Sequence, residues 1–237
     1  MKNLILIAGS ICLMQMPLNL PSQNLDEIIA KHIEAVGGTQ NWSKLKSLRT
    51  ESIMKVEGAE IRFVTTSVDK TASRQEIMVM GMTGYTLLKS NEGWNYMPWM
   101  GQQKAEAMTA DDVKNAQDDL YLQDDFMTYK EQGKSIEYFG MDDVDGTECH
   151  KIKMTGKEGK ETTYYIDPDN FLVIKQTDKT LSNGQERENS TFFSDYKKLD
   201  EGLVYPMSSS GGWGEINITK MDINPKVDES LFKVSSN

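Results

Sequence analysis

The first part of the chain follows a helical pattern of apolar residues. Between residues 25 and 36, leucine, isoleucine and valine recur at spacings of three and four, which places them on one face of a helix. Asn24 stands before this stretch as a helix-capping residue, and Gly37-Gly38 ends it. A second, short helix is predicted over residues 39–45.

From Ser47 the pattern changes to an alternation of apolar and polar residues, which is typical of strands that bury one face. Turn sequences separate the alternating segments, and two clear ones are Asp167-Pro168-Asp169-Asn170 and Ser182-Asn183-Gly184-Gln185. The pattern predicts about ten or eleven strands in one continuous up-and-down sheet. A sheet of this size tends to curl, so helices are expected to cover its concave face.

A helical stretch interrupts the strands between residues 108 and 129. Thr109 is suited to cap it, and Val113 and Leu120 contribute to a buried stripe. Pairs of aspartates occur at residues 111–112, 118–119 and 124–125, and such pairs invite a metal or an acid–base interpretation. Because a metal site needs ligands that converge from several directions, we expect these pairs to form a solvated acidic face instead.

The composition is that of a globular protein, and the length fits one large β domain or two small ones; the strand series without a linker favours one domain. The chain has 237 residues, of which 38% are hydrophobic and 26% are charged. Its formal net charge is −10, and no basic stripe offsets the excess of acidic residues. This charge argues against binding to nucleic acid or to an anionic membrane surface.

The N-terminus has the pattern of a secretory signal peptide. Met1-Lys2-Asn3 gives a basic start, and the apolar run that follows is too short to span a bilayer. We predict a signal peptide at residues 1–22 and a mature domain at residues 23–237 without a transmembrane segment. An outer-membrane lipoprotein anchored at Cys12 is the less favoured alternative, because Ile11 stands where lipidation requires a small residue.

Motifs for catalysis or for cofactor binding are not found in the sequence. It contains no nucleophile elbow, phosphate loop or zincin motif. Its two histidines, His32 and His150, have no Cys/His cluster around them, and Cys149 is expected to be a small buried hydrophobe. We therefore predict a protein that is not an enzyme, with no catalytic residues, metal or cofactor, and with a periplasmic hydrolase as the minority alternative.

Short motifs spread over most of the mature chain carry a family resemblance. They are Ala35-Val36-Gly37-Gly38, Trp42-Ser43-Lys44-Leu45-Lys46-Ser47-Leu48, Tyr164-Tyr165-Ile166-Asp167-Pro168, Gly202-Leu203-Val204-Tyr205-Pro206, Ile218-Thr219-Lys220, Ile223-Asn224-Pro225 and Asp228-Glu229-Ser230-Leu231-Phe232. Together they resemble the LolA/LolB superfamily of periplasmic lipoprotein carriers, in particular its outer-membrane lipoprotein-sorting relatives in Bacteroidetes-type bacteria. The resemblance implies a mainly β (α+β) fold. In this fold a single large curled antiparallel sheet forms an unclosed β-barrel, with the N-terminal helices and the mid-chain helix on its concave side.

The resemblance also implies a function. It implies a non-enzymatic periplasmic protein that binds lipoproteins or lipids, shelters their acyl chains in an apolar cavity and carries them toward the outer membrane. Inner- and outer-membrane sorting components would be its further partners. The strands of the first half are rich in methionine, whose flexible side chain suits a surface that accepts varied apolar shapes.

Large apolar residues on the predicted strands are the candidate lining of this cavity. They are Met54, Val56, Met78, Met80, Leu87, Trp94, Tyr96, Trp99 and Trp213. The same residues can instead fill the core of an interaction module with the same fold. A structure without a cavity above ~300 Å³ behind the sheet would favour that alternative.

Overall fold

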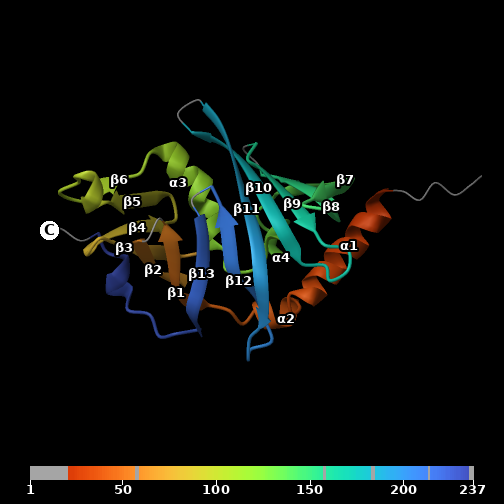
Figure 1. The fold of residues 1–237 in the computed structure, drawn as a ribbon, viewed down its shortest axis with the longest axis horizontal. Coiled ribbons are helices and arrows are strands. Elements are labelled where there is room, and N and C mark those ends of the chain that lie inside the picture. The colour runs from red at the N-terminus through yellow and green to blue at the C-terminus, as the bar shows by residue number, and fades with distance from the viewer. Residues whose placement is uncertain (1–20, 57–58, 157–158, 183–184, 213, 235–237) are drawn as a thin grey trace, which may run out of the picture.

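The computed structural model describes residues 21–56, 59–156, 159–182, 185–212 and 214–234, and most of these residues belong to one sheet (Figure 1). The sheet has 13 strands, and neighbouring strands pair in antiparallel fashion. The strands are β1 (Ser47–Val56), β2 (Ala59–Val68), β3 (Ala72–Val79), β4 (Met82–Lys89), β5 (Glu92–Tyr96), β6 (Glu106–Ala107), β7 (Ser135–Val144), β8 (Thr147–Thr155), β9 (Glu161–Ile166), β10 (Val173–Ser182), β11 (Gln185–Lys198), β12 (Val204–Gly211) and β13 (Gly214–Ile223). The helices are α1 (Pro21–Ala35), α2 (Thr39–Trp42), α3 (Ala110–Ala116) and α4 (Asp125–Thr128), with short 3-10 helices η1 (Pro98–Met100), η2 (Gln117–Leu120) and η3 (Glu229–Phe232).

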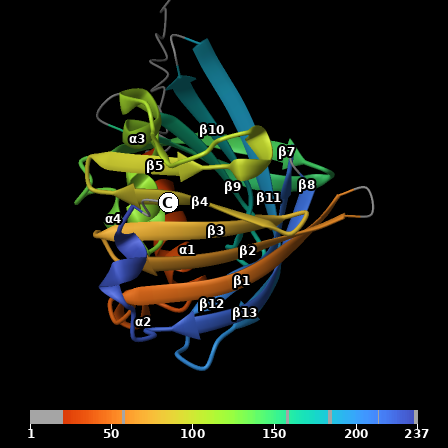
Figure 2. The ribbon, with the colours of Figure 1, turned by 90° about the vertical axis from the view of Figure 1, so that its left-hand side faces the viewer.

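The strand order shows two meanders that join along one line. Strands β1 to β6 follow one another in space, as do β7 to β13, and the pairing of β1 with β13 connects the two series. The order ends at β6 on one side and at β7 on the other, and the sheet curls without closing (Figure 2). The predicted curled, unclosed antiparallel sheet is therefore confirmed. It has more strands than predicted because an element such as the two-residue β6 leaves no alternating pattern in the sequence.

Helices occupy the concave side of the sheet, between the two meanders (Figure 1). Ile28 and Ile29 of α1 belong to a buried cluster with Ile152 of β8 and Ile166 of β9. The mid-chain helix α3 lies against β5 of the first meander and β10 of the second, while η2 lies against β3 and β4. The predicted placement of the N-terminal and mid-chain helices on the concave side is thus confirmed.

Two successive leucines of β4 identify the concave face and the outer face of the first meander. Leu88 packs against Val113 of α3 and Leu120 of η2, so it faces the concave side. Leu87 points to the opposite face, as successive strand residues do, and it packs there with Phe232 of η3. The C-terminal segment therefore covers part of the outer face of β3 and β4.

The N-terminal helix begins at Pro21. The predicted signal peptide at residues 1–22 consequently lies almost wholly outside the residues that the structure describes. Within the described part of the chain, none of the helices combines the length and the apolar character needed to cross a bilayer.

The end of α1 approaches the sheet so closely that only glycine fits there. The Val204 amide of β12 donates a hydrogen bond to the Val36 carbonyl over 2.9 Å. The next residue, Gly37, has a φ of 105°, and a Cβ atom at this position would collide with the carbonyl oxygen of Gly202. Gly38 also has a positive φ, of 81°, but a Cβ atom there would meet nothing within 4 Å.

This difference predicts unequal effects of two alanine substitutions. Gly38→Ala should lower the free energy of unfolding by about 1–3 kcal/mol through backbone strain alone, because its φ of 81° and ψ of 150° are almost restricted to glycine. Gly37→Ala should lower it by about 1–3 kcal/mol more, because the methyl group also forces α1 away from the loop that precedes β12. Urea unfolding of both variants and the parent chain measures the difference. Equal losses would contradict the close approach of the helix to Gly202.

Candidate functional site

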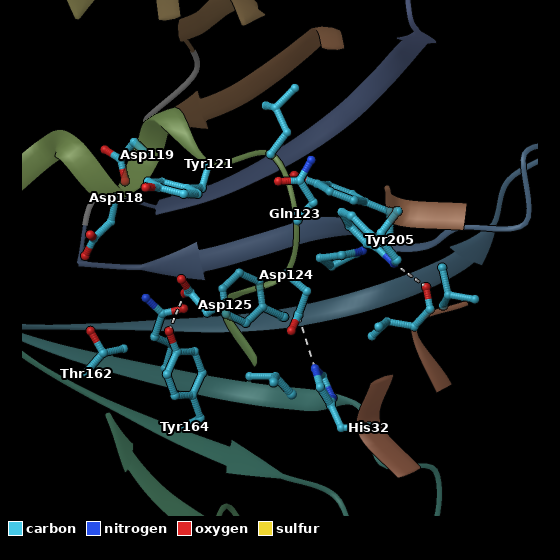
Figure 3. A pocket seen from close by; sticks show the side chains of 18 of the residues that line it. His32, Asp118, Asp119, Tyr121, Gln123, Asp124, Asp125, Thr162, Tyr164 and Tyr205 are labelled. Carbon is cyan, nitrogen blue, oxygen red and sulfur yellow. Dashed lines mark hydrogen bonds and ion pairs between the residues drawn. The ribbon is translucent and has the colours of Figure 1, made fainter. Parts of the chain in front are cut away.

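A cavity of about 350 Å³ lies between the concave face of the second meander and the helices (Figure 3). Its walls come from the end of α1, from α2, from the segment of residues 118–125 and from strands β9 to β12. Segments that are far apart in the sequence therefore meet around one space, and the lining includes both apolar and charged side chains. We call the segment of residues 118–125 the covering segment, because it closes one side of the cavity.

One end of the cavity is apolar. Trp42 of α2 is buried, and its indole N–H donates a hydrogen bond to the Val36 carbonyl over 2.8 Å. The Trp42 ring lies against the Tyr205 ring of β12, with 6.3 Å between the ring centroids. Val204 joins this wall through its backbone bond to Val36. We call this group, with Leu122 of the covering segment, the apolar end.

His32 of α1 links the helix to the covering segment. Its ring is 1% exposed, with Nδ1 2.7 Å from the Phe171 carbonyl oxygen and Nε2 3.1 Å from Oδ2 of Asp124. A carbonyl and a carboxylate oxygen both accept hydrogen bonds, so this geometry suits a ring that carries a proton on each nitrogen. Burial lowers the pKa of His32, but the Asp124 carboxylate and the Phe171 carbonyl outweigh this effect and raise the pKa above its ordinary value.

The other end of the cavity is acidic. Asp118 forms ion pairs with Lys160 and Lys134, and each lysine Nζ lies 3.0 Å from its Oδ2. Burial raises the pKa of Asp118, but the two lysines outweigh burial and lower it below its usual range. We call Asp118, Asp119, Asp125 and Asp178 the acidic end; Figure 3 shows the first three on the side away from Tyr205.

The remaining carboxylates of the acidic end differ in their partners. Tyr164 of β9 donates a short hydrogen bond to Oδ2 of Asp125. Asp178 accepts hydrogen bonds from the Thr162 hydroxyl at 2.7 Å and from the Gln176 amide at 2.9 Å. Asp119 makes no hydrogen bond or ion pair with any residue that the structure describes.

Two of these carboxylates have raised pKa values. Burial raises the pKa of Asp125, and the neighbouring Lys134 and the Tyr164 hydroxyl only partly offset it. Burial likewise raises the pKa of Asp119 to about 6, with Lys160 opposing and the carboxylates of Asp118 and Asp178 adding to the rise. The Asp119 side chain nevertheless stays accessible from the cavity. Asp119 is therefore the carboxylate here that is open to a ligand.

The expectation of a solvated acidic face is wrong for two of the three aspartate pairs. The side chains at 118–119 and 124–125 border the cavity, and Asp124 is 19% exposed while it pairs with His32. Asp118, Asp124 and Asp125 are partly withdrawn from solvent because the chain around them folds onto the concave face, which sequence spacing does not show. The pair at 111–112 lies in the first turn of α3, where Thr109 caps the helix as predicted.

The residues around the cavity can hold a ligand that has both apolar and polar parts. Across the described residues, no three His, Cys, Asp or Glu side chains are placed to hold a metal ion. The buried Cys149 thiol is far from activation, because burial and nearby aspartates raise its pKa to about 11. The site combines an apolar wall with a set of hydrogen-bond acceptors, which is a suitable arrangement for holding an amphiphilic ligand.

The predicted lining residues of the first meander do not border this cavity. Met54 and Val56 do lie on the concave face, because they alternate in phase with Leu48, which packs near Trp42. Trp99 also reaches the concave side, where its ring lies over Gly84. A ligand therefore contacts this face of β1, or η1, only if it extends beyond the cavity.

The other predicted lining residues lie elsewhere. Leu87 packs on the outer face with Trp94 and Tyr96. Met78 shares that face through its alternation with Arg74, whose guanidinium lies over the Tyr85 ring. Met80 is 86% exposed in the turn between β3 and β4, and Trp213 lies outside the described residues. Whether any of these residues contacts a ligand stays a prediction.

Residues of the observed cavity gave weak signals in the sequence. His32 follows Ile28 and Ile29 on the apolar face of the first helix, and a histidine on such a face marks a buried polar contact. Tyr164 and Tyr205 lie within the motifs of the family resemblance. Which strands would surround them depended on the curl of the sheet, and no local pattern carries that information.

Comparison with known proteins agrees with this architecture. No family model and no curated protein sequence matches the chain. A LolA superfamily protein from Nitrosomonas europaea is similar in structure, with a TM-score of 0.56, 14% identity and coverage of 88% of this chain and 96% of that one. A DUF1329 family protein from Desulfovibrio piger has a TM-score of 0.56, 13% identity and coverage of 88% and 96%. A domain assigned to outer membrane lipoprotein sorting, from Vibrio parahaemolyticus, has a TM-score of 0.51, 13% identity and coverage of 87% and 94%.

These likenesses establish the fold. The chain has a LolA-like fold, as the resemblance of its motifs implied. At identities of 13% and 14% they do not carry over the cargo or the partners of those proteins.

The His32 contact predicts a dependence of stability on pH. The pKa of His32 is raised on folding, so the stabilisation is fully present below the unfolded-state pKa and is lost as the pH rises through the folded-state pKa. His32→Gln keeps hydrogen-bonding groups but cannot be protonated. At about pH 6 it should lower the free energy of unfolding by about 3–5 kcal/mol, and at about pH 9 by clearly less. Urea unfolding of the variant and the parent chain at both pH values measures these losses. Asp119 titrates in both proteins, so its contribution cancels when the variant is compared with the parent. A loss that is the same at both values would contradict the charged pair with Asp124.

Proposed function

We propose that this protein binds the acyl chains of lipids or lipoproteins in the periplasm and carries them toward the outer membrane without catalysing a reaction. The observation that carries the proposal is the cavity of about 350 Å³ on the concave side of an unclosed sheet, with Trp42, Val204 and Tyr205 in its apolar wall. The LolA-like fold supports it, since the similar structures include a lipoprotein-sorting domain. The predicted export of the chain supports the periplasmic location.

The energetics of acyl-chain transfer suit such a cavity. Each CH₂ group that moves from water into an apolar space gains ~0.8 kcal/mol. Several methylene groups therefore provide useful affinity without a specific polar contact. The cavity lies at the lower end of the range for ligand pockets, ~300–1,000 Å³. It is suited to one chain, and a second chain would need further space.

We propose the covering segment as the part that moves when a ligand enters. Leu120 of this segment is anchored, because it packs in the buried cluster with Leu88 of β4. The contacts of the following residues with the turn between β2 and β3 are polar. The Leu122 amide donates to Asp69 over 3.1 Å, and the Gln123 amide donates to the Leu45 carbonyl over 3.3 Å and to Asp69 over 3.2 Å. Water can replace such bonds at little net cost. Residues 121–125 can therefore detach from this turn while Leu120 stays packed.

We further propose that a long chain extends from the cavity along the concave face of β1. Met54 and Val56 lie on that face, with Val56 37% exposed at the end of the strand. Both residues were expected to line the cavity. The outer-face residues Leu87, Trp94 and Tyr96 are packed with the C-terminal segment instead, and we assign them no part in binding.

The interaction module with a filled core is the second candidate. It is favoured by the same packing of Leu87, Trp94 and Tyr96, in which Leu87 is fully buried and the other two side chains are partly buried. The cavity also exceeds the ~300 Å³ limit only narrowly. This module would bind a partner through its outer surface and would take up no lipid.

A pair of matched substitutions tests the location of the acyl chain. Val204→Asp places a charge in the apolar end and should weaken the binding of a fluorescent fatty alcohol at least about tenfold, because the carboxylate resists transfer from water. Met80→Asp makes the same chemical change in an exposed turn and should leave binding unchanged. Fluorescence titration measures the affinity, and thermal unfolding confirms that each variant is folded.

Three outcomes separate the candidates. Selective loss in Val204→Asp supports the cavity as the binding site. Selective loss in Met80→Asp would move the site to the residues predicted from the sequence. A parent chain that takes up no fatty alcohol at all would contradict the carrier and favour the interaction module.

A further inference from the structure

The apolar and the charged groups of the cavity lie at opposite ends. Val36, Trp42, Val204 and Tyr205 are connected by direct contacts at one end. Figure 3 shows Asp118, Asp119 and Asp125 at the other end, with Asp124 between them and His32. A ligand that satisfies both ends must itself be apolar at one end and polar at the other.

The polar end offers acceptors and an excess of negative charge. Its lysines are both committed to Asp118, and Lys134 also lies 3.6 Å from Asp125. Asp178 is held by neutral donors only. Asp119 has no hydrogen-bonding or ion-pairing partner within the described ranges. Asp119 and Asp178 thus border the cavity without an ion pair of their own, and Lys160, which pairs with Asp118, acts on both only through longer-range attraction.

We infer that the ligand of this cavity is a single-chain amphiphile with a cationic, amine-bearing head, whose head binds Asp119 and Asp178 and whose chain lies along Trp42 and Tyr205. This inference rests on the proposed function and specifies its ligand. An ammonium group donates hydrogen bonds only, which matches a set of carboxylate acceptors. An anionic head would be repelled by the same groups. The volume of about 350 Å³ limits the ligand to one chain.

Asp119 is charged under ordinary conditions. Burial and the neighbouring carboxylates raise its pKa to about 6, against the opposing effect of Lys160, so most of it is ionised above pH 7. A bound ammonium group would relieve the repulsion among Asp118, Asp119 and Asp178. A carboxylate head would not reduce this repulsion among the aspartates.

A series of probes with one tail and different heads tests this assignment. Dodecylamine, dodecanol and dodecanoate are titrated into the full chain by calorimetry at about pH 7.5, below the concentrations at which they aggregate. We expect dodecylamine to bind at least about tenfold more tightly than dodecanoate, with dodecanol between them. Asp119→Asn and Asp178→Asn should each reduce this preference while leaving the affinity for dodecanol unchanged. Asp111→Asn, which removes an exposed carboxylate of α3, is the matched control and should change nothing.

The source of the amine needs separate probes. An S-hexadecyl-cysteine peptide with a free amino terminus represents an acylated polypeptide, and its N-acetylated form is the control. Tighter binding of the free amine than of the acetylated peptide would favour a lipoprotein terminus, whereas binding of dodecylamine alone would favour an amino lipid.

The outcomes distinguish this inference from the proposed function. Equal binding of all three heads, or tighter binding of dodecanoate, would overturn the cationic head and leave acyl-chain binding intact. The absence of binding by every probe would overturn acyl-chain binding itself. The head-group preference of the parent chain decides the question even if Asp178→Asn, which loses the partner of Thr162, fails to fold.

Discussion

The pairing of β1 with β13 is the constraint on which the rest of this structure depends. It places the beginning of the first meander beside the end of the second and so turns two local series of hairpins into one sheet. A right-handed twist accumulates over its 13 strands and makes the sheet curl. Helices bury apolar parts of the concave face that results. Helix α1 covers the second meander, and α3 with η2 covers the first.

The covering segment differs from the helices in what holds it. Helices α1 and α3 are buried through isoleucine and valine side chains, and Leu120 at the start of the segment is buried in the same way. The residues that border the cavity are held by ion pairs and hydrogen bonds such as His32 to Asp124 and Tyr164 to Asp125. Charged groups lose hydration when they are buried, and a pair is a weak source of stability compared with apolar packing. This contrast supports the proposal that residues 121–125 move while the helices stay in place.

Local features of this fold could be predicted from the sequence because short-range interactions determine them. Thr109 caps α3, with its side chain accepting a hydrogen bond from the Asp112 amide. In the turn before β10, Asp167 accepts bonds from the Asp169 amide and the Asn170 side chain, as turn residues of this type do. The helical face of α1 and the alternation of the strands followed from periodicity in the same way.

The binding site could not be predicted in this way, because it depends on faces and on distant contacts. In β4, Leu87 and Leu88 are both buried, with 0% and 4% of their surface exposed, so alternation does not say which of them faces the helices. The aspartates of the covering segment look like solvated residues until the chain brings Lys160 and Tyr164 to them from β9 and the turn before it. We therefore predicted that large apolar residues on strands line the cavity, and not the acidic residues that border it.

Native mass spectrometry of the mature chain, purified without detergent, tests the central claim most directly. A chain that carries acyl groups should retain co-purified lipid or acylated peptide as a defined mass increment. That increment should disappear after organic extraction, and the extract should contain a species with a single acyl chain. A bare chain that also fails to take up a fluorescent fatty alcohol would contradict the carrier and leave the LolA-like fold to serve another kind of interaction.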